Sequence, residues 1–422
     1  MKFDTILLQY AHKPSDNRNC ITVPIYQTTA FSFDTVQYAQ DLFDLKVAGD
    51  IYTRLTNPTT QTLEERLAAL EGGVGALCTS SGQSASLLSI LNIANSGDNI
   101  VASENLYGGT VNLLGVSLKK MGIETRFVAS ENKEDYEKLI DDKTKCIFAE
   151  TLNNPSLKIA DIEELAKLAH KYSIPLIVDN TIPSPYLLRP IEFGADIVVH
   201  STTKYIGGHG HALGGVIVDS GKFDWEKSGK FPELVDPDAS YHGLSYTKTF
   251  GAAAFIVKAR AHLIRDLGTT PAPINSYLTI LGLETLHLRM QRHSESAMKV
   301  AEFLQTHPNV TWVNYPKLPS SKQFKKAQKY LPDGASSIVS FGVKGGRQGG
   351  TKFIEELKLL IHATNIGDAR SIITYPALTT HRQLSDEQME ACGIGIDFMR
   401  LSVGLEDVDD IIADLKQALD KI

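Results

Sequence analysis

Between residues 76 and 219 the sequence alternates short, β-branched apolar runs with segments of helical periodicity. Alternation of this kind predicts βαβ units, and hence a mainly parallel sheet with helices on both faces. The fold class is therefore α/β, and any site is expected at the carboxyl ends of the strands. The predicted strands are 76–79, 99–102, 125–128, 145–150, 175–179, 195–199 and 216–219.

Two of these strands end in residues whose side chains could take part in catalysis. One is followed by His200-Ser201-Thr202-Thr203-Lys204, and the strand before it ends in Asp179. A lone lysine after a strand is more often a solvated loop residue. If the two strands are neighbours, however, an amine, a carboxylate and hydroxyls meet at one sheet edge. Lysine forms imines readily when burial lowers its pKa. This combination of groups is the one that pyridoxal phosphate requires.

The composition of the chain limits the classes of partner that we expect it to bind. The 422 residues are enough for two or three domains, and 42% apolar with 22% charged residues is ordinary for a globular protein. A net charge of −7 without a basic block argues against nucleic acid and anionic membranes as partners. No signal peptide or membrane-spanning run is evident, so a cytoplasmic location is expected. The cysteines are scattered, as in reducing compartments, at Cys20, Cys78, Cys146 and Cys392.

The first 59 residues resemble an arm more than a domain, because no apolar face is long enough to form a core. The arm ends in an extended segment that contains Tyr52 and Arg54. Residues two apart in such a segment point the same way. A tyrosine hydroxyl beside an arginine can bind an anion, although a surface aromatic next to a solvated arginine is the simpler interpretation.

Several loop residues could contribute to a site. Tyr107 lies in a predicted strand-to-helix turn and could stack on an aromatic ring or simply pack on its helix. Asn154 could donate to a ring oxygen or be a turn asparagine before proline. The turn at Ser80-Ser81-Gly82 opens a helix whose N–H groups could bind phosphate. His209 and His211 are too few to predict a metal site.

The second half of the chain has a different pattern. A long insertion at 221–250 contains aromatic residues and is expected to be ordered. A helical region at 251–307 leads to alternating strands at 336–343 and 398–403, which predict a smaller α+β domain. Arg400 lies in the second of these strands between apolar neighbours. It is a candidate to bind a substrate carboxylate, and a structural ion pair is the alternative.

Taken together, these stretches resemble the Cys/Met-metabolism family of pyridoxal-phosphate enzymes over nearly the whole chain. The resemblance implies the aspartate-aminotransferase-like fold, with a large, mainly parallel seven-stranded sheet domain and a smaller α+β C-terminal domain. It implies an arm at 1–59, a cofactor domain at 60–256 and a C-terminal domain at 257–422. The motifs are Tyr52-x-Arg54-x-x-Asn57-Pro58-Thr59, Ser80-Ser81-Gly82, Leu106-Tyr107-Gly108, Val178-Asp179-Asn180-Thr181, Ser201-x-Thr203-Lys204-Tyr205 and Arg400-Leu401-Ser402-Val403-Gly404.

The resemblance also assigns roles. Lys204 would form the imine and shuttle protons, Asp179 would pair with the pyridine nitrogen, and Tyr107 would stack on the ring and assist proton transfer. Tyr52 and Arg54 would reach the phosphate in a neighbouring subunit, so that a homo-oligomer, a tetramer of two active dimers, shares its sites. The remaining cofactor contacts would be Ser81, Gly82, Gln83, Asn154, Ser201 and Thr203, and the substrate contacts Tyr52, Asn154, Asn365 and Arg400.

Within the family the chain is most similar to O-acetylhomoserine sulfhydrylases, which make homocysteine from an amino-acid ester and sulfide or a thiol. The motif at 237–243 and Asn365 carry that similarity, and Gly109 stands where methionine γ-lyases have cysteine. Tyr375 and His211 depart from the family pattern. Cystathionine γ-synthase and methionine γ-lyase are the alternatives, and a non-catalytic scaffold is a distant one. A dinucleotide-binding protein is disfavoured because no GxGxxG follows the first strand.

Overall fold

The computed structural model describes residues 1–379, 382 and 394–422. Cys392 therefore lies outside the described residues. A seven-stranded sheet forms the larger body, in the order β1-β7-β6-β5-β4-β2-β3. Only β7 runs antiparallel to its neighbours. The predicted large, mainly parallel sheet is confirmed, and β5 and β6 are adjacent. The strands are β1 Gly75–Thr79, β2 Asn99–Ser103, β3 Glu124–Val128, β4 Thr144–Glu150, β5 Leu176–Asp179, β6 Ile197–His200 and β7 Gly215–Asp219.

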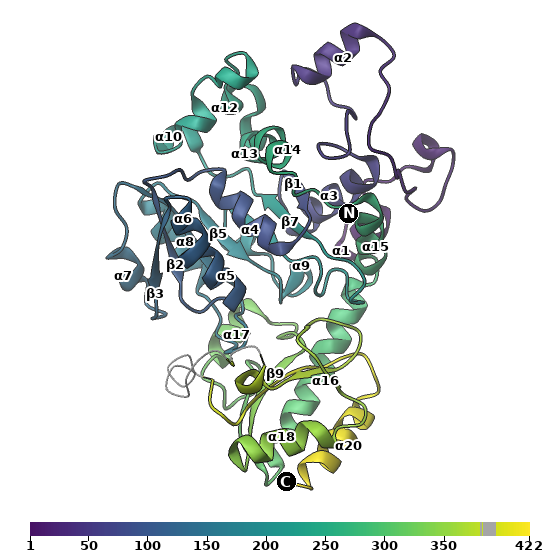
Figure 1. Cartoon of the computed structure of the whole chain (residues 1–422), viewed down its shortest axis with the longest axis vertical. Helices are drawn as coiled ribbons and strands as arrows, with labels where there is room; N and C mark the ends of the chain where they lie inside the picture. Colours follow the sequence, from purple (N-terminus) through teal and green to yellow (C-terminus); the bar gives the residue numbers. More distant parts are fainter. Residues whose placement is uncertain (380–381, 383–393) are drawn as a thin grey trace.

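Helices cover both faces of this sheet (Figure 1). Successive residues of β5 pack into different apolar clusters, Ile177 with Leu88 of α4 and Val178 with Leu67 of α3. This explains why the central strands are apolar throughout instead of alternating. The helices of this body are α3 Pro58–Glu71, α4 Gly82–Leu91, α5 Gly108–Asn112, α6 Leu118–Lys120, α7 Lys133–Glu137, α8 Ile162–Lys171 and α9 Ser184–Leu187.

The insertion at 221–250 is ordered, as its aromatic residues predict. Trp225 stacks on Phe255 with ring centroids 5.4 Å apart, and Phe231 packs edge-on against Trp225. Stacked and edge-on pairs of this kind stabilise a small apolar cluster. The helices here are α10 Trp225–Ser228, α11 Pro232–Val235, α12 Tyr246–Phe250, α13 Ala254–Lys258, a π-helical stretch Ala259–Ile264 and α14 Arg265–Leu267.

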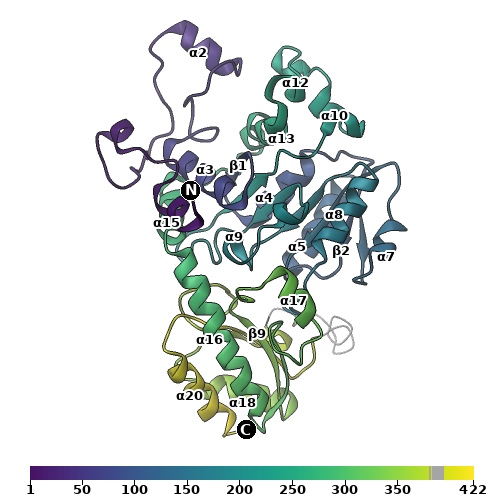
Figure 2. The same cartoon turned by 180° about the vertical axis from the view of Figure 1, so that it is seen from behind.

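The C-terminal part is built on a second sheet of five strands, in the order β10-β11-β12-β9-β8, which agrees with the predicted α+β domain. α16 runs from the large body along this sheet (Figure 2). The exact domain limits stay a prediction. The elements are α15 Pro273–Leu283, α16 Leu286–Thr306, β8 Val310–Asn314, α17 Phe324–Tyr330, β9 Ile338–Val343, α18 Gly346–Glu356, β10 Ile361–His362, β11 Ile372–Thr374, β12 Phe398–Ser402 and α20 Val408–Leu419.

Beyond its first helix, which contacts α3, the N-terminal arm extends away from the large body (Figure 1). It carries two short helices, α1 Phe3–Gln9 and α2 Val36–Phe43. Ile21 and Val36 are 88% and 86% exposed, an unusual amount for apolar side chains in a segment with so little core of its own. In the described part of the chain, no helix combines the length and apolar character needed to cross a membrane.

Candidate active site

The two predicted strand ends lie together. β5 and β6 are parallel neighbours, with Asp179 in register with Val199, so the chain enters the Lys204 turn beside the end of β5. Thr181 ties the two ends together. Its backbone N–H donates to Asp179 Oδ1 at 2.9 Å, and its hydroxyl accepts from the Ser201 N–H at 2.8 Å. Asp179 and Lys204 therefore belong to one sheet edge, as the sequence predicts.

Lys204 is partly buried, and its ammonium Nζ donates to Asn365 Oδ1 at 2.7 Å. Burial, followed by the positive charge of Arg400, lowers the pKa of the lysine. Among the described residues no carboxylate forms an ion pair with it. A lysine in such surroundings releases its proton more easily than one in water and becomes a better nucleophile.

Arg400 stands in β12 with 8% of its surface exposed. One terminal nitrogen donates to Asn154 Oδ1 at 3.2 Å and the other to Thr374 Oγ1 at 3.0 Å, while its Nε has no partner. No carboxylate in the described part of the chain pairs with it, so the described residues provide no structural ion pair for this guanidinium. Burial lowers its pKa to about 10. A buried guanidinium without a counter-anion is suited to bind one.

An anion could also bind where α4 meets the Lys204 turn. Ser81 caps this helix by accepting from the Ser84 N–H at 3.1 Å, and a Cβ added to Gly82 would lie only 2.6 Å from Ser201 Cβ. Only glycine therefore lets the N–H groups that begin α4 approach this turn. Thr203 already exchanges hydrogen bonds with Gly214, and Gln83 donates to Thr110 Oγ1 at 3.2 Å.

Tyr107 immediately precedes α5 and is 53% exposed. Its backbone N–H donates to Glu150 Oε1 at 2.6 Å. Glu150, which sequence reasoning missed, ends β4 in register with Asp179. Burial, followed by the charge of Asp179, raises the pKa of Glu150 well above its usual range, and burial also raises that of Asp179. The signal was present in the sequence, because the strand at 145–150 ends in a carboxylate just as the strand at 175–179 does.

Two predicted residues do not join this group within one chain. Tyr52 and Arg54 are exposed in the arm, and the Arg54 guanidinium lies 5.5 Å from the centre of the Tyr52 ring.

His209 and His211 form only a ring contact with each other, and the described residues contain no cluster of three potential metal ligands. Tyr375 is buried and donates to the Ile396 carbonyl at 2.5 Å, so this departure from the family pattern has a structural role.

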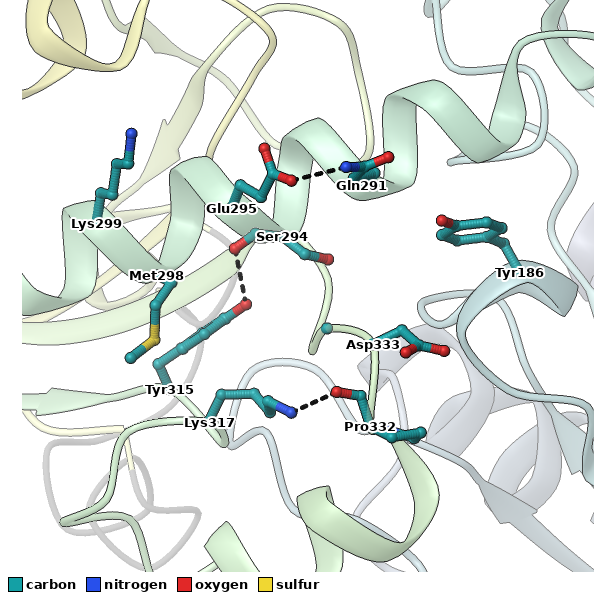
Figure 3. A pocket seen from close by; sticks show the side chains of 11 residues that line it. Tyr186, Gln291, Ser294, Glu295, Met298, Lys299, Tyr315, Lys317, Pro332 and Asp333 are labelled. Atoms are coloured by element: carbon teal, nitrogen blue, oxygen red, sulfur yellow. Dashed lines mark hydrogen bonds between the residues drawn. The ribbon is translucent and has the colours of Figure 1, made fainter.

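A cavity of about 650 Å³ lies elsewhere, between α9, α16 and the segment after α17 (Figure 3). Its lining includes Tyr186, Ser294, Glu295 and Lys317. None of the predicted site residues lines it. Lys317 already donates to the Pro332 carbonyl at 2.7 Å, and Glu295 accepts from Gln291 at 2.9 Å. This cavity is therefore separate from the Lys204 site.

The groups around Lys204 fit pyridoxal phosphate. The Asp179 carboxylate is placed to keep a pyridine nitrogen protonated, and the start of α4 with Ser201 offers donors for a phosphate. When bound, this cofactor supplies an electron sink that stabilises negative charge at the α-carbon of an amino acid. The fold and this set of groups are those of pyridoxal-phosphate-dependent enzymes.

Comparison with known proteins gives the family. The chain belongs to the Cys/Met metabolism PLP-dependent enzymes, which it matches over residues 4–420. It is 49% identical to O-acetyl-L-homoserine sulfhydrylase of Leptospira meyeri, covering 100% of this chain and 97% of the relative. It is 45% identical to homocysteine/cysteine synthase of Saccharomyces cerevisiae, covering 100% and 98%.

A solved structure agrees with these relatives. The crystal structure of a Campylobacter jejuni protein, assigned as an O-acetylhomoserine (thiol)-lyase, is 41% identical and superposes with a TM-score of 0.96 over 100% of both chains. That protein carries a lysine modified by pyridoxal phosphate, as N'-pyridoxyl-lysine-5'-monophosphate. The predicted aspartate-aminotransferase-like fold and the predicted cofactor are both confirmed.

Proposed function

We propose that this chain is an O-acetylhomoserine sulfhydrylase, which replaces the acetate of O-acetylhomoserine by sulfide to form homocysteine. The observation that carries the proposal is that Lys204 and Arg400 lie at the same site. Among the residues that the structure describes, Arg400 has no carboxylate partner, and it lies close enough for its charge to lower the pKa of the lysine. An α-amino acid brings the carboxylate that the guanidinium lacks. The names of the full-length relatives supply the leaving group and the sulfur donor.

The residues would then divide the work as follows. Arg400, with Asn154 and Asn365, holds the substrate carboxylate and so fixes the orientation of the α-carbon. Lys204 takes the proton from that carbon and passes it on, because its lowered pKa leaves a larger share of the amine unprotonated. Tyr107 covers the ring and receives a proton from the incoming amine, and Asp179 keeps the pyridine nitrogen protonated.

The active unit is proposed to be an oligomer in which sites are shared. Tyr52 and Arg54 stay exposed within one chain, and so do Ile21 and Val36 of the arm. A second copy that covers the arm would bury this surface and bring an arginine to the phosphate end of its neighbour's site. We propose that the oligomer is a tetramer and that the protein is cytoplasmic. The location is supported by the absence of a disulfide among the described cysteines.

A substrate panel tests the activity. Purified enzyme is given O-acetylhomoserine with sulfide, then O-acetylhomoserine with cysteine, then methionine alone, with Lys204→Ala as the inactive control. We expect homocysteine and acetate in the first reaction, at a rate far above the other two. Preferred turnover with cysteine would indicate cystathionine γ-synthase. Release of methanethiol from methionine as the main reaction would indicate a methionine γ-lyase and contradict the proposal.

A further inference from the structure

Arg289, at the start of α16, is buried against the turn that carries Lys204. Its side chain donates from Nη1 to the Tyr205 carbonyl at 2.7 Å and from Nη2 to the Ile206 carbonyl at 3.2 Å. The same Nη2 reaches the Gly282 carbonyl of α15 at 2.6 Å. Three carbonyl oxygens from two parts of the chain thus converge on one guanidinium that is 5% exposed.

This cation has no carboxylate to balance it in the part of the chain that the structure describes. A buried charge is costly unless every donor is used. Here the carbonyl dipoles take the place of a counter-ion, and Thr285 Oγ1 accepts from Nε at 3.2 Å. A protein that needed only a link between α16 and the sheet could use a neutral side chain. The planar fork of arginine is what allows adjacent carbonyls and α15 to be held at once.

The packing around the turn leaves little freedom. A Cβ on Gly208 would lie 2.1 Å from Arg289 Nη1, and a Cβ on Gly282 would lie 2.1 Å from the Gly207 oxygen. Gly208 also has a φ of +69°, a conformation that favours glycine. Backbone, glycine and guanidinium therefore form one closely packed unit directly after Lys204.

We propose that Arg289 is a positioning residue for Lys204, fixing the turn that carries the amine by binding the carbonyl oxygens of Tyr205 and Ile206. The inference rests on the role of Lys204 in the proposed function. Arg289 reaches the chemistry only through the turn, so it is not itself a catalytic residue. The consequence is that elements of the C-terminal half, α15 and α16, set the position of a lysine carried by the large sheet (Figure 2).

The experiment compares two buried arginines of the holoenzyme. Arg66 is the control, because it is 1% exposed and also donates to backbone carbonyls, those of Leu7, Leu8 and Tyr10. It holds α1 and, unlike Arg289, also forms an ion pair, with Glu284 at 3.2 Å. Arg289→Lys and Arg66→Lys are measured for thermal unfolding, for kcat and KM, and for the pH midpoint of the visible band of the lysine-bound cofactor. Thr285→Val is a milder third variant at an exposed position, because it removes the Nε partner and the hydrogen bond from the Thr285 hydroxyl to the Gly282 carbonyl but keeps the guanidinium.

Arg289→Lys is expected to raise the pH midpoint by about one unit, because a looser turn admits water to the imine nitrogen and so favours its charged, protonated form. Its kcat should fall at least about tenfold with KM changed less, as expected when a reacting group is misplaced. Thr285→Val should shift the midpoint less, in the same direction, and remains informative if Arg289→Lys does not fold. Arg66→Lys should lower only the unfolding temperature.

The proposal is overturned if Arg289→Lys loses thermal stability as Arg66→Lys does, while midpoint and kcat stay unchanged. It is also overturned if Thr285→Val leaves the midpoint at the wild-type value when Arg289→Lys cannot be folded. Lys204→Ala separates this result from the proposed function. Should that variant keep the visible band, the role of Lys204 fails regardless of Arg289.

Discussion

Glu150 Oε1 accepts a hydrogen bond from the backbone N–H of Tyr107 at 2.6 Å, while the Glu150 backbone pairs in register with Asp179. The Glu150 carboxyl group therefore holds the loop that carries Tyr107, the residue proposed to stack on the ring. Glu150 also lies beside Asp179, the proposed partner of the pyridine nitrogen. Two ionised carboxylates in such a place would repel each other. Burial and the Asp179 charge raise the pKa of Glu150, so this carboxyl takes the neutral form more readily than an ordinary glutamate does.

This arrangement predicts different results for two substitutions at Glu150. Glu150→Gln is neutral and keeps the acceptor, so cofactor affinity should change less than about threefold. Glu150→Ala removes the acceptor that holds the Tyr107 N–H and should weaken cofactor affinity about tenfold or more. Titrating apoenzyme with pyridoxal phosphate and following the visible band measures both. Equal loss in the two variants would show that Glu150 acts as a charged group.

The contact between Lys204 and Asn365 predicts a kinetic effect. Without the Asn365 Oδ1 acceptor at 2.7 Å, the lysine amine loses the group that orients it between proton transfers. Asn365→Ala should lower kcat by about tenfold, the amount expected for one lost hydrogen bond to a charged group, with a smaller change in KM. Steady-state kinetics with O-acetylhomoserine and sulfide provide the check. An unchanged kcat with a raised KM would assign Asn365 to substrate binding alone.

Arg400 predicts the opposite pattern. Arg400→Lys keeps the charge but not the fork that binds a carboxylate at two points. The KM for O-acetylhomoserine should rise about 10- to 100-fold, with kcat less affected. The same assay with sulfide as the varied substrate is the control, since sulfide has no carboxylate. A KM effect on sulfide equal to that on O-acetylhomoserine would contradict the assignment.

Stability at alkaline pH should depend on Asp219 at the end of β7. It is 1% exposed, Oδ2 has no partner, and burial raises its pKa to about 7. The folded state then binds a proton that the unfolded state has released, so stability falls between pH 3.8 and about 7. Asp219→Asn removes a penalty of the order of 4 kcal/mol at pH 8. The variant should therefore unfold at a higher temperature than wild type at pH 8 but not at pH 4. A gain of equal size at both pH values would contradict this account.

The part of the site that lies on neighbouring strands could be predicted from sequence. Apolar runs ending in Asp179 and leading to Lys204 predict a shared sheet edge, because parallel strands deliver their carboxyl ends to one side. Gly82 was predictable for a related reason, since the helix that follows a βα turn begins with free N–H groups.

Contacts between distant parts of the chain could not be predicted in this way. Asn365 is 161 residues from Lys204, and Arg289 is 84 residues from Tyr205. Nothing in the helical pattern around Arg289 distinguishes it from a solvated arginine until the fold places it against the turn. The roles of Tyr52 and Arg54 stay predictions, because they depend on a second chain.

The proposed roles of the site residues all depend on which lysine holds the cofactor. Reducing the holoenzyme with borohydride fixes pyridoxal phosphate to that lysine, and mass spectrometry of the digested protein locates it. The expected result is one modified peptide carrying the label on Lys204, absent from Lys204→Ala. A label on another buried lysine, such as Lys258, or an unlabelled Lys204 in a fully loaded enzyme, would contradict the account.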